Sequence, residues 1–375
     1  MMTSCSVQNQ ALLIGSSHET ELHMVNAMNG AQLFCFKQCR PSQLGIQVIP
    51  RTESLVCIQA NKLVIHLYSW SHASPIFKCH VAEKLGPVCV TQCGNFVFAG
   101  AQSSGKVYVW DVKTGQLVAV WDAHYKGVRA IALTSDDSHL VTAGEDAIVH
   151  VWRLVDILEE SDASTSFQSM SSLVSWTDHV LPVTSIHTSQ GGVNGRVYTS
   201  SLDRTCKIWS LFSKQCLYSI TLPSFVNVCL SDELEQHLFA GCGDGKIYCI
   251  DLHTAAAANT AAMARIVQEK ASNKNGHTSL LSNFLCGHED SITALQVSAC
   301  GSLLYSGSAD STVRVWDVYS RQTLHTMKLF KGPVSCLRLL PKVPAKLGCK
   351  AKTQTTTLLP VTPFKKYMDS EQLGM

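Results

Sequence analysis

Histidine, serine and aspartate recur in this chain in an arrangement that first suggests hydrolytic chemistry. His288, Ser306 and Asp310 supply the three residue types of a nucleophilic triad, in which an imidazole activates a hydroxyl and a carboxylate orients the imidazole. Ser306 precedes Asp310 by four residues, and Trp316 follows Asp310 by six. The same types recur at the same offsets, with Thr in place of Ser, in two further groups: His124, Thr142, Asp146 and Trp152, then His179, Thr199, Asp203 and Trp209.

These residues are positioned by a repeat of about forty residues, of which Gly287 to Asp317 is the most complete copy. The copy begins with Gly-His, ends with Trp-Asp and contains short apolar strands, which is the signature of a WD-repeat β-propeller. The position of Trp316 recurs six more times, at Val25, Tyr68, Trp110, Trp152, Trp209 and Ile250. Seven such positions predict an all-β fold, a seven-bladed propeller closed into one domain over residues 1–340.

The resemblance to WD-repeat propellers implies a structural role for the triad-like residues. In that family the imidazole bridges a carboxylate in a tight turn and a hydroxyl on a strand, and the hydroxyl reaches the indole N–H. Each buried polar group is then paired, which avoids the cost of an unsatisfied donor or acceptor. We therefore expect three structural networks, in blades 4, 5 and 7, and no catalytic residue.

The chain ends also predict how the ring closes. Val334–Leu340 resembles the inner strand of the other repeats, whereas the N-terminal region offers three strands, near residues 11–15, 21–26 and 32–36, and no inner one. We expect Val334–Leu340 to complete the first blade and remove an exposed edge. Residues 341–375 are rich in Lys, Thr and Pro and are predicted to form a flexible tail. Its apolar part, 358–364, is expected to lie along the propeller or a partner.

Two insertions interrupt the period, one after Trp152 and one after Leu252. A helical turn is expected over 154–160 and a short Ala-rich helix over 254–270. Both insertions fall between the third and fourth strands of their blades and thus on one face of the disc. We predict a partner-binding surface there, formed by Leu154, Ile157, Leu158, Met263, Ile266 and Val267. The alternative is that both insertions are tolerated surface loops.

Composition limits the other function classes. The chain has 375 residues, 46% of them apolar, and a net charge of +2, which gives no reason to expect binding to nucleic acid or a membrane. Its 16 cysteines form no CxxC pair, so no metal site is predicted, and free thiols fit a reducing compartment. Gly100–Lys106 has phosphate-loop spacing, but Val107 replaces the Mg²⁺-binding Ser or Thr and no helix follows. We expect no cofactor, no small-molecule substrate and no enzyme activity.

Three stretches resemble a particular family, the WD-repeat subunit of the rixosome, a complex that matures the large ribosomal subunit. They are Ala123–Asp146, His179–Trp209 and Lys331–Val334, and the similarity covers most of residues 10–340. This resemblance implies a non-catalytic scaffold in pre-rRNA processing, located in the nucleolus and nucleoplasm and also possible in the cytoplasm. It implies a helical-repeat scaffold protein and other rixosome subunits as partners, with an AAA remodelling ATPase and the pre-ribosome reached indirectly.

The alternative function is a substrate receptor of a cullin-type ubiquitin ligase, or another propeller adaptor. Such receptors often carry Trp-Asp-x-Arg at the end of a blade. In this chain Tyr319 occupies the Arg position after Trp316-Asp317, and Lys113 occupies it after Trp110-Asp111. The motif is absent from both blades.

Overall fold

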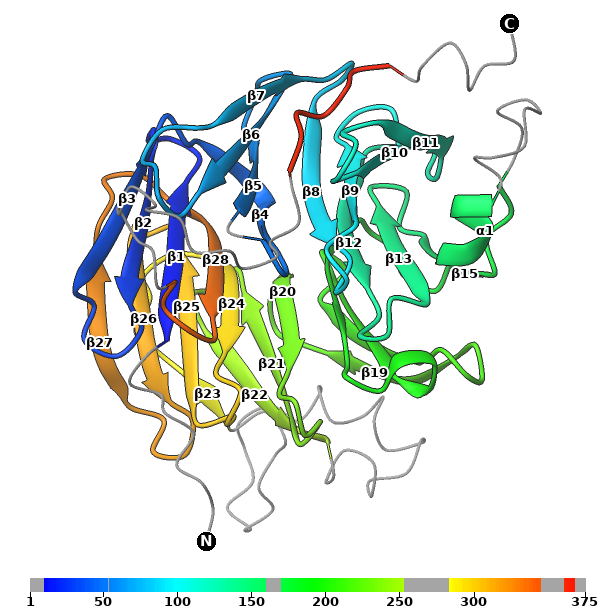
Figure 1. The fold of residues 1–375 in the computed structure, drawn as a ribbon. Coiled ribbons are helices and arrows are strands. Elements are labelled where there is room, and N and C mark those ends of the chain that lie inside the picture. Colours follow the sequence, from blue (N-terminus) through cyan, green and yellow to red (C-terminus); the bar gives the residue numbers. More distant parts are fainter. Residues whose placement is uncertain (1–9, 53, 160–169, 253–282, 345–360, 368–375) are drawn as a thin grey trace, which may run out of the picture.

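The computed structural model describes residues 10–52, 54–159, 170–252, 283–344 and 361–367. Within them, seven antiparallel sheets of four strands each radiate from a common axis (Figure 1). The inner strands contact one another in an unbroken cycle, β28, β4, β8, β12, β16, β20, β24 and back to β28. The seven-bladed all-β propeller predicted from the repeats is therefore confirmed.

Each blade is a meander of four short strands, counted from the axis outward. Blade 1 contains β28 (Val334–Leu340), β1 (Ala11–Ser16), β2 (Glu21–Asn26) and β3 (Gln32–Lys37). Blade 2 contains β4 (Pro41–Ile49), β5 (Ser54–Gln59), β6 (Val64–Ser69) and β7 (Phe77–His80). Blade 3 contains β8 (Leu85–Val90), β9 (Phe96–Ala101), β10 (Lys106–Asp111) and β11 (Leu117–Asp122). Blade 4 contains β12 (Val128–Leu133), β13 (His139–Gly144), β14 (Val149–Arg153) and β15 (Val174–Trp176).

The last three blades follow the same plan. Blade 5 contains β16 (Val183–Thr188), β17 (Arg196–Ser201), β18 (Thr205–Ser210) and β19 (Gln215–Thr221). Blade 6 contains β20 (Val226–Ser231), β21 (His237–Cys242), β22 (Ile247–Asp251) and β23 (Phe284–Leu285). Blade 7 contains β24 (Ile292–Val297), β25 (Leu303–Ser308), β26 (Thr312–Asp317) and β27 (Thr323–Lys328). A 3₁₀ turn, η2 (Gly192–Asn194), joins β16 to β17.

The ring closes as the sequence predicts. β28 pairs antiparallel with β1, with Ala11 opposite Leu340 and Gly15 opposite Cys336. Because β28 is the innermost strand of blade 1, the two ends of the propeller form one sheet. Pairing removes two edges that would otherwise expose unpaired backbone groups.

The core lies between the blades. Each apolar cluster joins two neighbouring sheets, as in the cluster that contains Trp110, Val97 and Leu85 of blade 3 with Val56 and Ile65 of blade 2. Both faces of a middle strand are therefore buried, which explains runs such as Leu303–Ser308 in which every residue is buried. Strands that are apolar on both faces need a neighbouring sheet on each side, which the closed ring supplies.

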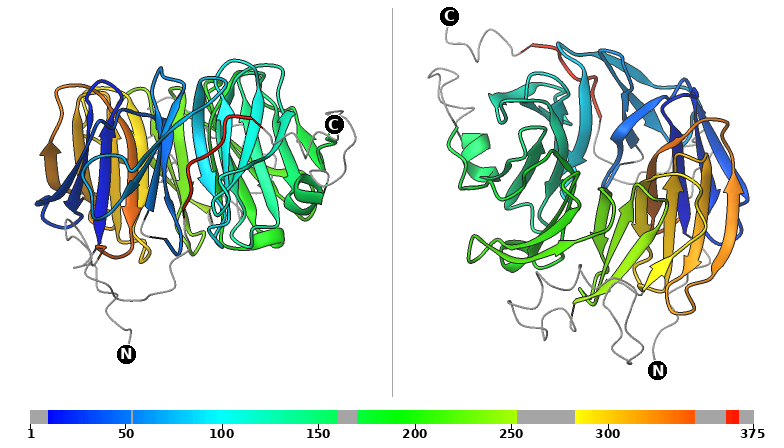
Figure 2. Two further views of the ribbon diagram at one scale, coloured as in Figure 1. Left: turned by 45° about the horizontal axis from the view of Figure 1, so that its top comes forward. Right: turned by 180° about the vertical axis from the view of Figure 1, so that it is seen from behind.

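The connections between strands define two faces of the disc. Turns between the second and third strands of a blade, and loops between blades, lie on one face. We call it the histidine face, because His124, His179 and His288 lie in these loops. The other connections form the insertion face, to which α1 (Leu154–Glu159) belongs, directly after β14 at the rim (Figure 2). The predicted helix over 254–270 lies outside the described residues.

The structure corrects the role expected for the first insertion. Leu154 and Ile157 are 7% and 1% exposed, and Leu158 packs against the same cluster, which includes Trp121 and Trp152. A six-residue amphipathic helix must bury its apolar side to be stable, and the nearest apolar surface is the propeller itself. These side chains are therefore not available to a partner. Met263, Ile266 and Val267 lie outside the described residues.

The described part of the C-terminal segment lies along the propeller, which is one of the two positions expected for the apolar part of the tail. Residues 361–367, red in Figure 1, run beside blades 2 and 3, where Phe364 is 5% exposed. The aromatic ring gains more from covering apolar surface than it loses by being ordered. Among the described residues, no helix has the length and apolar character needed to span a bilayer.

Candidate functional site

In blade 7 the four repeat residues form one chain of hydrogen bonds. The Trp316 indole N–H donates to Ser306 Oγ over 2.7 Å, and the Ser306 hydroxyl donates to His288 Nε2 over 2.7 Å. His288 Nδ1–H then donates to Asp310 Oδ2 over 2.9 Å. Asp310 is ionised and its carboxylate can therefore only accept, so the bond to Asp310 assigns the hydrogen of the imidazole to Nδ1. Burial lowers the pKa of His288, although Asp310 opposes this effect, so the ring is neutral near neutral pH.

Blade 4 contains the same chain with Thr142 as its hydroxyl. Trp152 Nε1 donates to Thr142 Oγ1 over 3.0 Å, and that hydroxyl lies 3.0 Å from His124 Nε2. His124 Nδ1 lies 3.1 Å from both carboxylate oxygens of Asp146. Burial alone would raise the pKa of Asp146, but hydrogen bonds from His124 and from two backbone N–H groups hold it below its ordinary value. The carboxylate is therefore ionised and fixes the imidazole.

Blade 5 has the tightest version of this network. Trp209 Nε1 donates to Thr199 Oγ1 over 2.9 Å, and His179 spans from that hydroxyl (2.8 Å) to Asp203 Oδ2 (2.9 Å). Burial would raise the pKa of Asp203, but hydrogen bonds from His179 and Thr205 bring it well below its ordinary value. The structure thus brings together all twelve residues that the sequence grouped into networks.

Sequence reasoning missed a fifth member in two of the three networks. Thr312 Oγ1 donates to Asp310 Oδ1 over 2.6 Å, and Thr205 Oγ1 donates to Asp203 Oδ1 over 2.5 Å. Each threonine follows its aspartate by two residues, so an Asp-x-Thr repeat was the available signal. Blade 4 has Ile148 at this position.

The networks cannot act as hydrolytic triads. Ser306, Thr142 and Thr199 are fully buried, and each hydroxyl oxygen already accepts an indole N–H. A nucleophile needs an open side from which a substrate can approach. These groups instead join a turn, two strands and the start of the blade into one rigid unit.

In the other four blades, the residue at the position of Trp316 either bonds to a backbone carbonyl or has no polar group. Tyr68 Oη donates to the carbonyl of Lys37, and Trp110 Nε1 donates to the carbonyl of Lys365 over 2.9 Å. Val25 and Ile250 have no polar group to satisfy and are buried among apolar neighbours. Departures from the repeat are therefore matched by local changes in packing.

An exposed apolar depression lies on the histidine face between blades 5 and 6. It has a volume of about 510 Å³ and is lined by Val180, Leu181, Leu202, Asp203, Arg204, Pro223, Ser224 and Phe225. Val180 is 82% exposed although it directly follows His179 of the network, and its backbone N–H is held by Asp203. The Phe225 ring lies over Gly243, where any side chain would collide with it. A rigid frame thus presents apolar side chains to solvent, beside Arg204, as expected for a protein-binding surface.

A second cluster of polar groups lies on blade 1. Glu21, His23 and Cys35 place one ligand-type atom each within 4.8 Å of one another across β2 and β3. Burial raises the pKa of the Cys35 thiol to about 11, and Glu21 adds to this effect. The thiol is therefore protonated and donates to the Glu21 carboxylate over 3.6 Å. Pairing of β2 with β3 brings these residues together. A search of the sequence for CxxC pairs therefore could not have found this cluster.

The closed ring of seven four-stranded sheets and the His–Ser/Thr–Asp–Trp networks define a WD-repeat β-propeller. The family model described as WD domain, G-beta repeat, matches residues 170–210 and 279–317, and a model described as WDR54 matches residues 70–166. The WD repeat-containing protein 18 of Mus musculus is 31% identical over 358 residues, covering 94% of this chain and 76% of that protein. The chain therefore belongs to the WD repeat-containing protein 18 family, and the resemblance seen in the sequence is confirmed.

More distant relatives carry names that refer to RNA processing. The pre-rRNA-processing protein crb3/ipi3 of Schizosaccharomyces pombe is 28% identical over 344 residues, covering 84% of this chain and 73% of that protein. The pre-rRNA-processing protein IPI3 of Yarrowia lipolytica is 28% identical over 277 residues, covering 73% of this chain and 61% of that protein.

Proposed function

We propose that this protein is a non-catalytic scaffold in pre-rRNA processing during maturation of the large ribosomal subunit. The observation that carries the proposal is similarity along most of the chain to two proteins named for pre-rRNA processing. The buried, fully engaged hydroxyls of the three networks support a role without catalysis. We place the protein in the nucleus, in nucleolus and nucleoplasm, with the cytoplasm as a further compartment.

The partners we propose are a helical-repeat scaffold protein and the other subunits of a rixosome-type complex. Through them the propeller would reach an AAA remodelling ATPase and the pre-ribosomal particle. The apolar depression between blades 5 and 6 is the contact surface that geometry supports best, since Val180 and Leu181 are exposed on a rigid loop. This surface replaces the one predicted on the insertion face, where Leu154 and Ile157 are buried.

The proposal is tested by replacing the endogenous protein with tagged versions of the chain. Depletion should cause precursors that retain the internal transcribed spacer to accumulate, and the unchanged chain should restore processing. Purification of the tagged chain should recover assembly factors of the large subunit. Unaltered pre-rRNA after depletion would refute the proposed function.

The contact surface has its own test. The double variant Val180→Glu and Leu181→Glu should reduce recovery of the helical-repeat partner at least tenfold, because two charges would be buried at the interface. The matched control is Phe212→Glu and Leu234→Glu, which alters two side chains that are 77% and 73% exposed in insertion-face connections. Normal recovery with the first variant would place the contact elsewhere while leaving the proposed function intact.

A further inference from the structure

The outer strand of each blade carries one residue that covers the next blade. It pairs with a residue on the third strand of its own blade. That residue lies three places before the one at the position of Trp316 in the repeat, as Val313 does in blade 7. In blade order the covering residues are Phe36, Cys79, Trp121, Trp176, Ile220, Leu285 and Met327. Trp176 stacks on Trp209 with ring centroids 4.6 Å apart, and Trp121 meets Trp152 edge-on at 5.7 Å. Cys79 is the one small residue in the series, so blade 2 leaves the next tryptophan, Trp110, uncovered.

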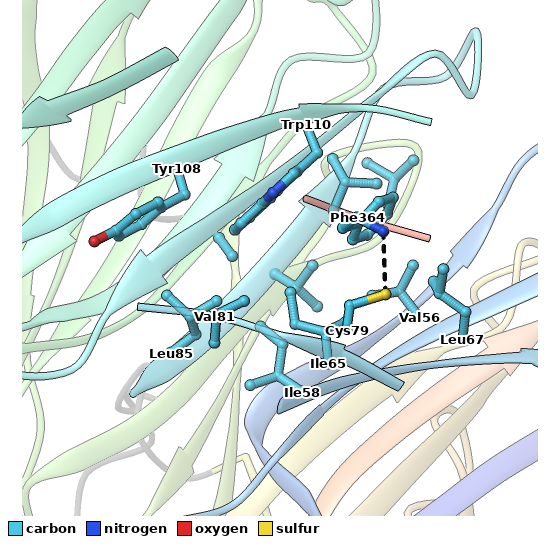
Figure 3. Packing of buried hydrophobic residues seen from close by; sticks show 14 of the residues in the cluster. Val56, Ile58, Ile65, Leu67, Cys79, Val81, Leu85, Tyr108, Trp110 and Phe364 are labelled. Carbon is cyan, nitrogen blue, oxygen red and sulfur yellow. Dashed lines mark hydrogen bonds between the residues drawn. The ribbon is translucent and has the colours of Figure 1, made fainter. Parts of the chain in front are cut away.

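Phe364 from the C-terminal segment fills the space above Trp110. Its ring stacks on the indole with centroids 5.7 Å apart and planes 16° from parallel, and Tyr108 stacks on the other side of the indole (Figure 3). The Phe364 backbone N–H donates to Cys79 Sγ over 3.1 Å. The short side chain of Cys79 thus creates the seat and also holds the residue that occupies it.

A second departure from the repeat leaves the Trp110 indole N–H without an acceptor inside its blade. In blade 4 the hydroxyl of Thr142 occupies the fourth position of β13, and the corresponding position of β9 in blade 3 is Ala99. The N–H of Trp110 donates instead to the carbonyl of Lys365 over 2.9 Å. A buried donor with no partner is costly, so blade 3 needs this acceptor from outside.

Backbone pairing completes the groove. Thr362 N–H donates to the Val112 carbonyl over 3.2 Å, and Lys365 N–H donates to the Gly115 carbonyl over 2.7 Å. Gly115 has φ +70°, and a side chain there would collide with the carbonyl oxygen of Pro363. Extended backbone, an aromatic pocket and an indole donor together form a peptide-binding groove, hereafter the blade 3 groove, in the manner of strand-addition sites.

Thr362, in the segment that occupies the groove, lies in a sequence pattern for phosphorylation. Thr362 is followed by Pro363 and, three residues on, by Lys365 in the order Thr-Pro-Phe-Lys, which is the substrate pattern of proline-directed protein kinases. The sequence has one other Ser/Thr-Pro pair, Ser74-Pro75, without a basic residue three places after the serine. We propose that residues 361–365 are a detachable occupant of the blade 3 groove and that phosphorylation of Thr362 releases them.

The chemistry of release follows from the Thr362 contacts. The kinase transfers the γ-phosphoryl group of ATP, so the bond from Thr362 Oγ1 to phosphorus forms, ADP leaves, and the hydroxyl proton passes to the kinase's carboxylate. The hydroxyl now donates to the Val112 carbonyl over 3.3 Å, and a phosphate ester cannot donate there. Its negatively charged oxygens would face the partial negative charge of that carbonyl, which raises the free energy of the seated state.

Release would uncover a groove able to bind another peptide of the same kind. Tyr108, Trp110 and Cys79 would face solvent, beside the free carbonyls of Val112 and Gly115. A partner segment with an aromatic residue in extended backbone could then bind, in competition with the tail. The tail competes at the high effective concentration of a tethered segment, so unmodified protein should bind such a peptide poorly.

Hydrogen exchange on the full chain tests the proposal. Treatment with a proline-directed kinase and ATP should modify Thr362 and increase deuterium uptake in residues 108–115 and 361–367. Thr362→Ala should show no increase under the same treatment, whereas Ser74→Ala should behave like the unchanged chain. Modification of Thr362 without increased uptake, for example because Lys113 pairs with the phosphate, would overturn the proposal. So would failure of the kinase to modify Thr362 in the Phe364→Ala chain, where the tail is free.

A peptide covering residues 360–367 provides a second measurement. It should bind the Phe364→Ala chain at least tenfold more tightly than the unchanged chain, and its Thr362-phosphorylated form should bind at least tenfold more weakly. Cys79→Trp refills the seat as Trp121 and Trp176 do in the next two blades, so this variant should bind no peptide while remaining folded. Equal binding by the two peptides would overturn the role of Thr362, and tight binding by Cys79→Trp would overturn the seat.

Discussion

A single hydroxyl at the centre of each network determines its stability. Thr142 accepts from the Trp152 indole and donates to His124, so Thr142→Val removes an acceptor and a donor in one isosteric change. Two buried groups then lose their partners, at about 1–3 kcal/mol each. We expect the free energy of unfolding to fall by about 2–6 kcal/mol in urea titration. Thr326→Val, an exposed site on β27, is the control and should change it by less than about 0.5 kcal/mol.

Titration of buried histidines should make the propeller less stable in mild acid. Burial lowers the pKa of His66 and His150 to about 4, with Lys78 and His124 respectively adding to the effect, from an ordinary value of 6.5. Below pH 6.5 these histidines are therefore protonated in the unfolded chain but remain neutral in the folded chain. The free energy of unfolding decreases as pH falls from 6.5 towards about 4. Asp146 and Asp203 have lowered pKa values, so their contribution is lost at still lower pH, below about 3.8.

The melting temperature between pH 8 and pH 4 measures this effect. It should decrease steadily below pH 6.5, and His150→Phe should reduce the slope because it keeps the ring against Trp152 and removes one titrating group. A melting temperature that stays constant from pH 7 to pH 5 would contradict the assignment of neutral, buried imidazoles.

At the scale of elements, the sequence predicts the strands and networks that recur among the repeats. It predicts little about contacts that occur only once. Equal offsets from Thr142, Thr199 and Ser306 to their tryptophans established register in three blades, and the other four followed by counting. That Cys79 leaves Trp110 uncovered could not be predicted, because it depends on contact between neighbouring sheets rather than on spacing along one strand. The same holds for Phe364, whose partner Trp110 lies about 250 residues away in the chain. For α1, amphipathic spacing predicted a helix but could not say whether its apolar side faces a partner or the propeller itself.

At the scale of the molecule, the chain after blade 7 makes two separable contributions. β28 supplies the inner strand of blade 1 and contacts β24 and β4 on either side, so it closes both the sheet and the ring. Residues 361–367 only cover blade 3, where Phe364 buries one aromatic side chain. The first contribution is shared by the whole ring, whereas the second is local to blades 2 and 3.

Two truncations separate these contributions. A chain ending at residue 344 keeps β28 and should fold cooperatively, with a loss of at most about 3 kcal/mol from the uncovered Trp110, reduced by the entropy that the tail regains. A chain ending at residue 332 also loses β28 and leaves β1, β24 and β4 without their neighbour. A closed ring cannot lose one inner strand locally, so this chain should unfold without a cooperative transition in calorimetry. If both chains melted with the same sharp transition, closure through β28 would not stabilise the propeller, and the pairing of Ala11 with Leu340 would be dispensable.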